Sequence, residues 1–126
     1  MTAAAGTTAA AAGGRALLLA TRASYGVALV TAPGAVIHRA TGRSPARRTR
    51  QVARLLGARH LIQAAVSAFA PMPEVLAAGA AVDALHAGSM IMLAIADRGA
   101  RRVALTDAVA EALFSVAGRR ASTIKG

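Results

Sequence analysis

The stretch VLAAGAAVDALHAGSMIMLAIA, residues 75–96, decides the fold of this chain. It is apolar for most of its length and carries one acid, Asp83, near its middle. A helix of that length, rising about 1.5 Å per residue, crosses a hydrocarbon core of roughly 30 Å. An ionisable residue at such a depth is costly and usually has a partner. The stretch therefore predicts a membrane-spanning helix with a polar contact at its centre.

The composition of the 126-residue chain agrees with this prediction. Hydrophobic residues make up 56%, above the roughly 45–50% of soluble domains, and much of the excess is alanine. Two Phe, one Tyr and no Trp leave few large side chains for a close-packed core in water. Small residues instead suit helices that approach closely in lipid. We expect one domain, without disulfide or thiolate chemistry because the chain has no cysteine.

The order of apolar segments and breaks predicts an all-α protein, a small antiparallel bundle of four helices. The expected helices are residues 16–37, 46–69, 74–96 and 102–117, of which three or four span the membrane. Pro33 should end or kink the first helix, and the Pro71–Pro73 turn separates the second from the third. Residues 1–14, almost all Ala, Thr and Gly, are expected to form a disordered tail, and residues 119–126 a basic C-terminal tail.

Charge is distributed very unevenly along the chain. The net charge is +10, fourteen of the 15 basic residues are arginine, and no acid precedes Glu74. Both connectors that flank the second and third helices are basic, whereas the Pro71–Pro73 turn is not. The positive-inside rule therefore predicts a multi-pass protein of the cell membrane with both basic connectors in the cytoplasm. The side chains expected to contact lipid headgroups are Arg43, Arg47, Arg50, Arg54, Arg98, Arg101 and Arg102.

The fourth expected helix is two-faced, with Asp107 and Glu111 opposite an apolar side. If this helix spanned the membrane, Arg119 and Arg120 would lie outside, against the positive-inside rule. A helix that lies along the inner surface or packs against the bundle avoids this conflict, so three spans plus an interfacial helix is preferred and four spans is the alternative. Asp107 and Glu111 are accordingly interpreted as a solvated face.

The second and third helices carry one polar cluster within apolar surroundings: Arg59, His60, Gln63, Asp83 and His86. Counted from the turn, Arg59 and Asp83 lie about 18 Å and about 15 Å along their helices. Because the connection is short, we expect the two helices to be antiparallel neighbours, packed through the small residues Ala80, Ala84 and Gly88. Pairing would remove much of the roughly 2.5–3.5 kcal/mol that a lone charge costs at the membrane midplane. We therefore predict that Arg59 pairs with Asp83.

The cluster is interpreted first as a structural clamp between the two helices. A proton or ion pathway through His60, Asp83 and His86 is an alternative, because histidine titrates near neutral pH. A metal site built from the same three residues is opposed by the neighbouring arginine. No nucleophile is paired with a base, so we expect no catalytic residue, and no metal or cofactor. An enzyme has no support beyond the cluster itself.

Two segments around this cluster, LGARHLIQ at residues 56–63 and VDALHA at residues 82–87, carry a resemblance. They look like segments of small, uncharacterised multi-pass membrane proteins found in actinobacteria. The resemblance covers roughly residues 50–117. It implies a membrane location and adds no site residue.

The sequence thus predicts a small integral membrane protein, a structural or accessory subunit that packs in the lipid bilayer against a larger membrane complex or against itself. The first alternative is a proton- or ion-coupled transport component that uses Arg59, His60, Asp83 and His86. The second is a soluble, basic, helical protein that binds nucleic acid, motivated by the many arginines. Nucleic acid is not the expected partner, since the chain has almost no aromatic side chains for stacking on bases.

Overall fold

The computed structural model describes the backbone of residues 2–123 and the side chains of residues 6–123. This part of the chain is all-helical, which confirms the predicted fold class, but it contains five helices rather than four. They are α1 (Thr2–Thr31), α2 (Pro33–Thr41), α3 (Arg47–Phe69), α4 (Pro73–Ala96) and α5 (Arg101–Thr123). The extra helix arises at Pro33, which begins α2 and bends the chain by 105° relative to α1.

The predicted boundaries of the two central helices hold to within a residue. Pro73 begins α4, and Glu74 lies in its first turn, where a negative charge faces the positive end of the helix dipole. The outer boundaries differ. Residues 2–14 are not a disordered tail in the structure but the first turns of α1, because alanine has the highest intrinsic helix propensity. Arg119 and Arg120 likewise belong to α5, while Lys125 lies outside the described residues.

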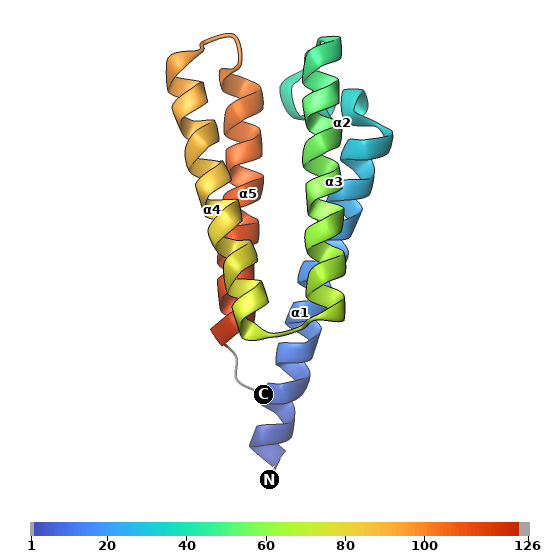
Figure 1. The fold of residues 1–126 in the computed structure, drawn as a ribbon, viewed down its shortest axis with the longest axis vertical. Helices are drawn as coiled ribbons and strands as arrows, with labels where there is room; N and C mark the ends of the chain where they lie inside the picture. The colour runs from blue at the N-terminus through green and yellow to red at the C-terminus, as the bar shows by residue number, and fades with distance from the viewer. Residues whose placement is uncertain (1, 124–126) are drawn as a thin grey trace.

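The five helices form two hairpins, one made by α1 and α3 and the other by α4 and α5 (Figure 1). The hairpins lie close at the α3–α4 connection, and their long helices diverge toward the other end, where α2 packs against both α3 and α5 (Figure 1). That other end carries the connections at residues 42–46 and 97–100 and the arginines of the adjoining helix ends, among them Arg47, Arg48, Arg101 and Arg102. These two connections with their adjoining arginines are the basic connectors, and this end is called the basic end below.

Of the two placements predicted for the last helix, the structure shows packing against the bundle, because α5 runs antiparallel along the length of α4. Near the basic end Arg101 Nε donates to the carbonyl oxygen of Ala94 at 2.9 Å. Near the other end a Cβ on Gly118 would lie 3.1 Å from that of Ala80. Ala80 therefore packs on α5 and not on α3, and Gly88 has open space beside it. The short α3–α4 connection joins two hairpins instead of making α3 and α4 close neighbours.

The interior side chains of the long helices recur at alternating spacings of three and four residues. This period of about 3.5 is the one at which helices pack side by side in left-handed bundles. The buried residues are Ala53, Gly57, His60 and Ala64 on α3, Leu76, Ala80, Asp83, Ala87 and Ala94 on α4, and Ala104, Ala108, Glu111, Ser115 and Gly118 on α5, where Phe114 is buried beside the regular series. Most of these side chains are small, and the largest of those fully buried are His60, Glu111 and Asp83.

One described helix, α4, is long and apolar enough to cross a membrane, and α1 with α2 would count as a second if the bent pair formed one span. The described parts of α3 and α5 do not meet this criterion, since they carry more charged side chains. The structure therefore supports a helical bundle with one clear apolar span, fewer than the three or four predicted.

Candidate functional site

A buried ionic network occupies the middle of the bundle, with Asp83 of α4 at its centre. The side chain of Asp83 is fully buried. Its Oδ2 accepts from Arg22 Nη2 at 2.5 Å, and its Oδ1 accepts from Arg59 Nη2 at 2.7 Å. Gln63 lies between these groups, because its Nε2 donates to Asp83 Oδ1 at 3.3 Å and its Oε1 accepts from Arg22 Nη1 at 2.8 Å. The predicted pair of Arg59 with Asp83 is thus present, as part of a larger set.

Glu111 of α5 is the second fully buried carboxylate of the network. Arg59 donates from Nη1 and Nη2 to its two oxygens at 3.3 and 3.2 Å. On the other side His60 Nε2 lies 3.0 Å from Glu111 Oε1. Arg59 therefore bridges two carboxylates on different helices, a geometry that the planar, multi-donor guanidinium group allows.

The charges are divided between the two hairpins by sign. Arg22, Arg59 and His60 come from α1 and α3, whereas the carboxylates come from α4 and α5. Buried charges are tolerated only when they are paired and hydrogen-bonded, so each hairpin needs the other to compensate its own buried charges. The network therefore holds the two hairpins together.

Three aromatic rings pack beside the network. The rings of Tyr25, His60 and Phe114 lie with centroids 5.2–5.8 Å apart. The guanidinium carbon of Arg22 lies 4.9 Å from the centroid of the Phe114 ring, within cation–π range. These rings shield the side chain of Arg22 from the exterior, and Arg22 as a whole is only 4% exposed.

His86 is separated from the rest of the predicted cluster. Its Nε2 lies 2.8 Å from Oδ2 of Asp107 on α5, and both side chains are partly exposed. Ligand-type atoms of His86, Asp107 and Glu111 lie within 4.8 Å of one another, a spacing that would allow a metal ion. Arg59 already binds Glu111 there and opposes a cation. Among the described residues, His60, Asp83 and His86 do not form such a set.

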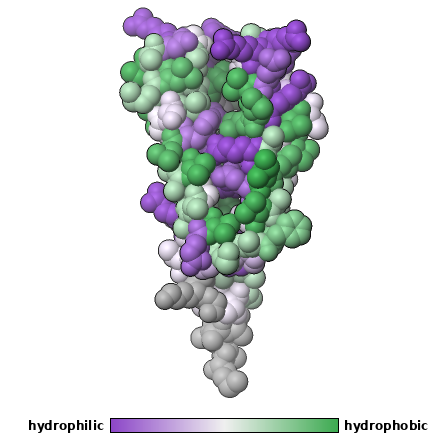
Figure 2. All heavy atoms as spheres, in the orientation of Figure 1, coloured by the Kyte–Doolittle hydropathy of each residue, from purple (hydrophilic) through white to green (hydrophobic). Residues whose placement is uncertain are grey.

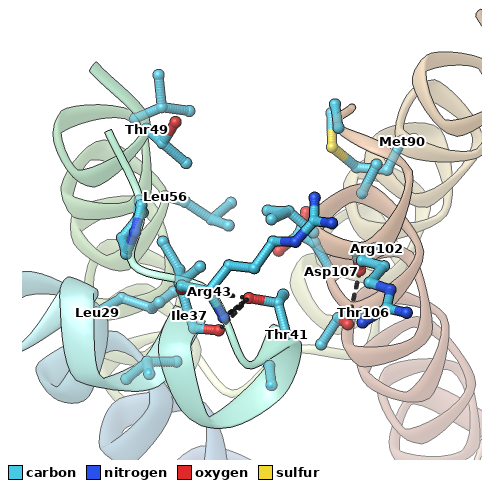
Figure 3. Close-up of a pocket in the computed structure, with 18 of the residues that line it drawn as sticks. Leu29, Ile37, Thr41, Arg43, Thr49, Leu56, Met90, Arg102, Thr106 and Asp107 are labelled. Atoms are coloured by element: carbon cyan, nitrogen blue, oxygen red, sulfur yellow. Dashed lines mark hydrogen bonds between the residues drawn. The ribbon is translucent and has the colours of Figure 1, made fainter. Parts of the chain in front are cut away.

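A cleft of about 550 Å³ opens between the two hairpins on the basic-end side of the network. Its walls are mostly apolar, and Figure 3 shows Leu29, Ile37 and Leu56 on one side with Met90 across from them. Tyr25, His86 and Asp107 also line it and are partly buried, so we assign them to its inner end. Arg43, Arg48 and Arg102 line it and are exposed, so we assign them to its mouth. Arg43 extends from the α2–α3 connection across the opening toward α5 (Figure 3).

The seven arginines expected to contact headgroups are all exposed. Two of them also make contacts within the protein: Arg54 Nε donates to the carbonyl oxygen of Val30 at 3.3 Å, and Arg101 Nε donates to that of Ala94. Hydrophilic residues gather at the basic end on both hairpins (Figure 2). A second hydrophilic band lies between the two hairpins at mid-height (Figure 2). The two basic connectors thus lie at the same end of the bundle.

Sequence reasoning missed two members of the network and the partner of His86. Arg22 was not expected to pair with Asp83, and Glu111 was expected to form a solvated face with Asp107, which instead contacts His86. The correction for Glu111 follows from its register, because it is spaced with Ala104, Ala108, Ser115 and Gly118 at the interior period. The helix buries its small residues, and Glu111 lies among them. A search for regularly spaced small residues would have found it.

The chain matches no protein-family model, no curated protein and no solved structure. Its function is therefore inferred from its own geometry.

Proposed function

We propose that the chain is an integral membrane protein with a structural or accessory role, in which the buried network joins two hairpins inside the bilayer. The observation that carries this proposal is the reversed placement of polar and apolar side chains. The largest fully buried side chains are ionisable, whereas large apolar side chains such as Ile62, Leu85 and Leu113 are exposed. Soluble monomers rarely expose extensive apolar surface, whereas lipid solvates it.

The most apolar helix gives independent support. Only 22% of the apolar window in α4 is buried within the bundle, whereas the apolar core helix of a soluble protein is mostly buried. Pairing within the network also lowers the cost of placing Arg22, Arg59 and Asp83 at membrane depth, which is about 2.5–3.5 kcal/mol for a lone charge. α3 and α5 would therefore enter the bilayer as members of hairpins with compensated charges.

The proposed orientation follows from the basic end. Both basic connectors lie there, and the positive-inside rule assigns that end to the cytoplasm. The exposed arginines would contact anionic headgroups of the inner leaflet. The apolar outer faces would then contact lipid, further copies of the chain or a larger membrane complex.

The membrane proposal is tested by extraction of cell membranes with alkaline carbonate. We expect the protein to stay in the pellet. A matched pair of variants sharpens the test, because Leu85→Lys adds a charge to an exposed apolar face whereas Arg98→Lys keeps the charge at the basic end. Leu85→Lys should reduce the amount found in membranes and Arg98→Lys should not. Release of the wild-type protein into the supernatant would overturn the proposal.

One observation favours proton coupling as a second candidate function. His86 lines the cleft, and its Nε2 lies 2.8 Å from Oδ2 of Asp107. Ligand-type atoms of this pair lie within 4.8 Å of the buried carboxylate of Glu111, which belongs to the network. A histidine–carboxylate pair between the cleft and a buried carboxylate is an arrangement along which a proton could pass from the basic end.

Proton coupling is tested in liposomes with a trapped pH-sensitive dye. The wild-type protein should move protons along an imposed potential, and His86→Gln should abolish this movement. The control is His38→Gln, an exposed histidine of α2 outside the cleft and the network. Equal movement by wild-type and His86→Gln protein, or none by either, would leave the network with its structural role alone.

A further inference from the structure

We propose that the cleft between the hairpins binds one anionic amphiphile, with a carboxylate or phosphate group at its basic mouth and an apolar chain along its walls. This site goes beyond the structural role proposed above. It rests on the membrane proposal only in that the bilayer is one source of such a molecule.

The walls fit an alkyl chain. Leu29, Ile37 and Leu56 line one side and Met90 the other (Figure 3), while Val103 of α5 packs against the cluster that contains Leu29 and Ile37. The volume of about 550 Å³ is within the range of roughly 300–1,000 Å³ that is typical of small-molecule sites. From His86 to Leu93 the α4 wall extends about 10 Å. The cleft therefore covers a chain of medium length, or the part of a longer chain nearest its head.

The mouth selects the charge of the head. Arg43, Arg48 and Arg102 line it, and none of them has an ion-pair partner among the described residues. Arg22 and Arg59, by contrast, have their carboxylates within the network. Unpaired guanidinium groups at the rim of an apolar cleft favour a carboxylate or phosphate, which they can bind through two parallel hydrogen bonds.

The inner end fixes the direction of the ligand. His86 and Asp107 satisfy one another there at 2.8 Å, so they do not require a polar group from the ligand. The carboxylate of Asp107 also repels a second anion. The anionic head is therefore held at the mouth, which is the end proposed to lie at the level of the cytoplasmic headgroups.

The charge requirement is tested with probes of one chain length added to purified protein in nonionic micelles. Decanoate and decyl phosphate should bind and raise the melting temperature. Decanol and decyltrimethylammonium should bind at least tenfold more weakly. Equal binding of the cationic and anionic probes would overturn the proposal.

Variants of the lining residues test whether the probes bind in the cleft. The double variant Arg43→Gln/Arg102→Gln should weaken decanoate binding at least tenfold, and Ala40→Phe, which fills one wall, should weaken binding of all the probes. The control is Arg98→Gln, an exposed arginine of the basic end that does not line the cleft. Decanoate binding that is unchanged in both cleft variants would overturn the proposal.

Native mass spectrometry from nanodiscs distinguishes the two sources of the ligand. Retention of phosphatidylglycerol over phosphatidylcholine, lost in Arg43→Gln/Arg102→Gln, would support a bilayer lipid. Retention of added decanoate without phosphatidylglycerol would support a free amphiphile. Retention of neither would overturn the site. The carbonate extraction is independent of this result, so the membrane proposal can stand where the cleft proposal fails.

Discussion

Arg59 Nη2 lies 2.7 Å from Asp83 Oδ1, although the two residues belong to different hairpins. The same guanidinium group also binds Glu111, while Asp83 also binds Arg22. Three ion pairs, Arg22–Asp83, Arg59–Asp83 and Arg59–Glu111, therefore connect all four long helices at one level. The stability of the bundle should depend on these few side chains more than on its small apolar interior.

Removing the charge of Asp83 should be strongly destabilising. Asp83→Asn leaves Arg22 and Arg59 without their shared carboxylate, and unpairing a buried charge costs about 3–5 kcal/mol. The measurement is the free energy of unfolding in nonionic micelles titrated with a denaturing detergent. Glu74→Gln, an exposed acid in the first turn of the same helix, should change it by less than about 0.5 kcal/mol. A similar change in the two variants would contradict the role given to the network.

Replacing Arg59 should destabilise the bundle through both buried carboxylates. Arg59→Gln leaves Glu111 with His60 as its remaining partner, while Asp83 keeps Arg22. Removing one member of a buried ion pair costs about 3–5 kcal/mol, so the free energy of unfolding in nonionic micelles should fall by that order. Arg54→Gln, from the exposed face of α3, should change it much less. An equal loss in the two variants would count against the charge argument.

The contact of α1 with α3 should not tolerate a methyl group at Gly57. A Cβ there would lie 2.7 Å from the carbonyl oxygen of Gly26 and 2.8 Å from Leu29 Cβ, so the two helices would have to separate. Overpacking of this kind costs about 1–3 kcal/mol. Gly88→Ala is the matched control, because nothing lies near its Cβ position and alanine favours the helix by up to about 1 kcal/mol. Unfolding free energies that fail to change in opposite directions would contradict this packing.

Replacing Ser115, unlike the substitutions above, should not destabilise the protein. Its hydroxyl group is buried and has no hydrogen-bond partner among the described residues. A buried polar group without a partner costs about 1–3 kcal/mol, so Ser115→Ala should be neutral or stabilising. Ser122→Ala, at an exposed end of α5 where the hydroxyl donates to the carbonyl oxygen of Arg119, serves as the control. A clear loss of stability in Ser115→Ala would mean that its hydroxyl has a partner in the membrane.

The sequence predicted the parts of the fold that follow from local signals. Pro33, Pro71 and Pro73 mark the helix boundaries because proline restricts the backbone wherever it occurs. Asp83 stood out because a single acid in a long apolar run requires a partner, and depth along the helix was enough to choose Arg59.

Which helices pack against one another could not be predicted from such local signals. The interior faces carry alanine, glycine and charges while the large apolar side chains point outward, so an apolar stripe indicates the wrong face. For this reason Glu111 was interpreted as part of a solvated face. Arg22 was missed because its contact with Asp83 joins residues 61 positions apart, which no local pattern reveals.

Cysteine labelling in intact membranes separates a lipid-facing surface from a water-facing one, and the natural chain has no cysteine to interfere. Leu85 is 74% exposed at mid-height of α4, so Leu85→Cys would react readily with a membrane-impermeant maleimide if the bundle were in water. In inside-out vesicles we expect Leu85→Cys to stay unlabelled until detergent denatures the protein, whereas Arg98→Cys at the basic end reacts at once. Equally rapid labelling of both variants before denaturation would contradict a bundle embedded in the bilayer.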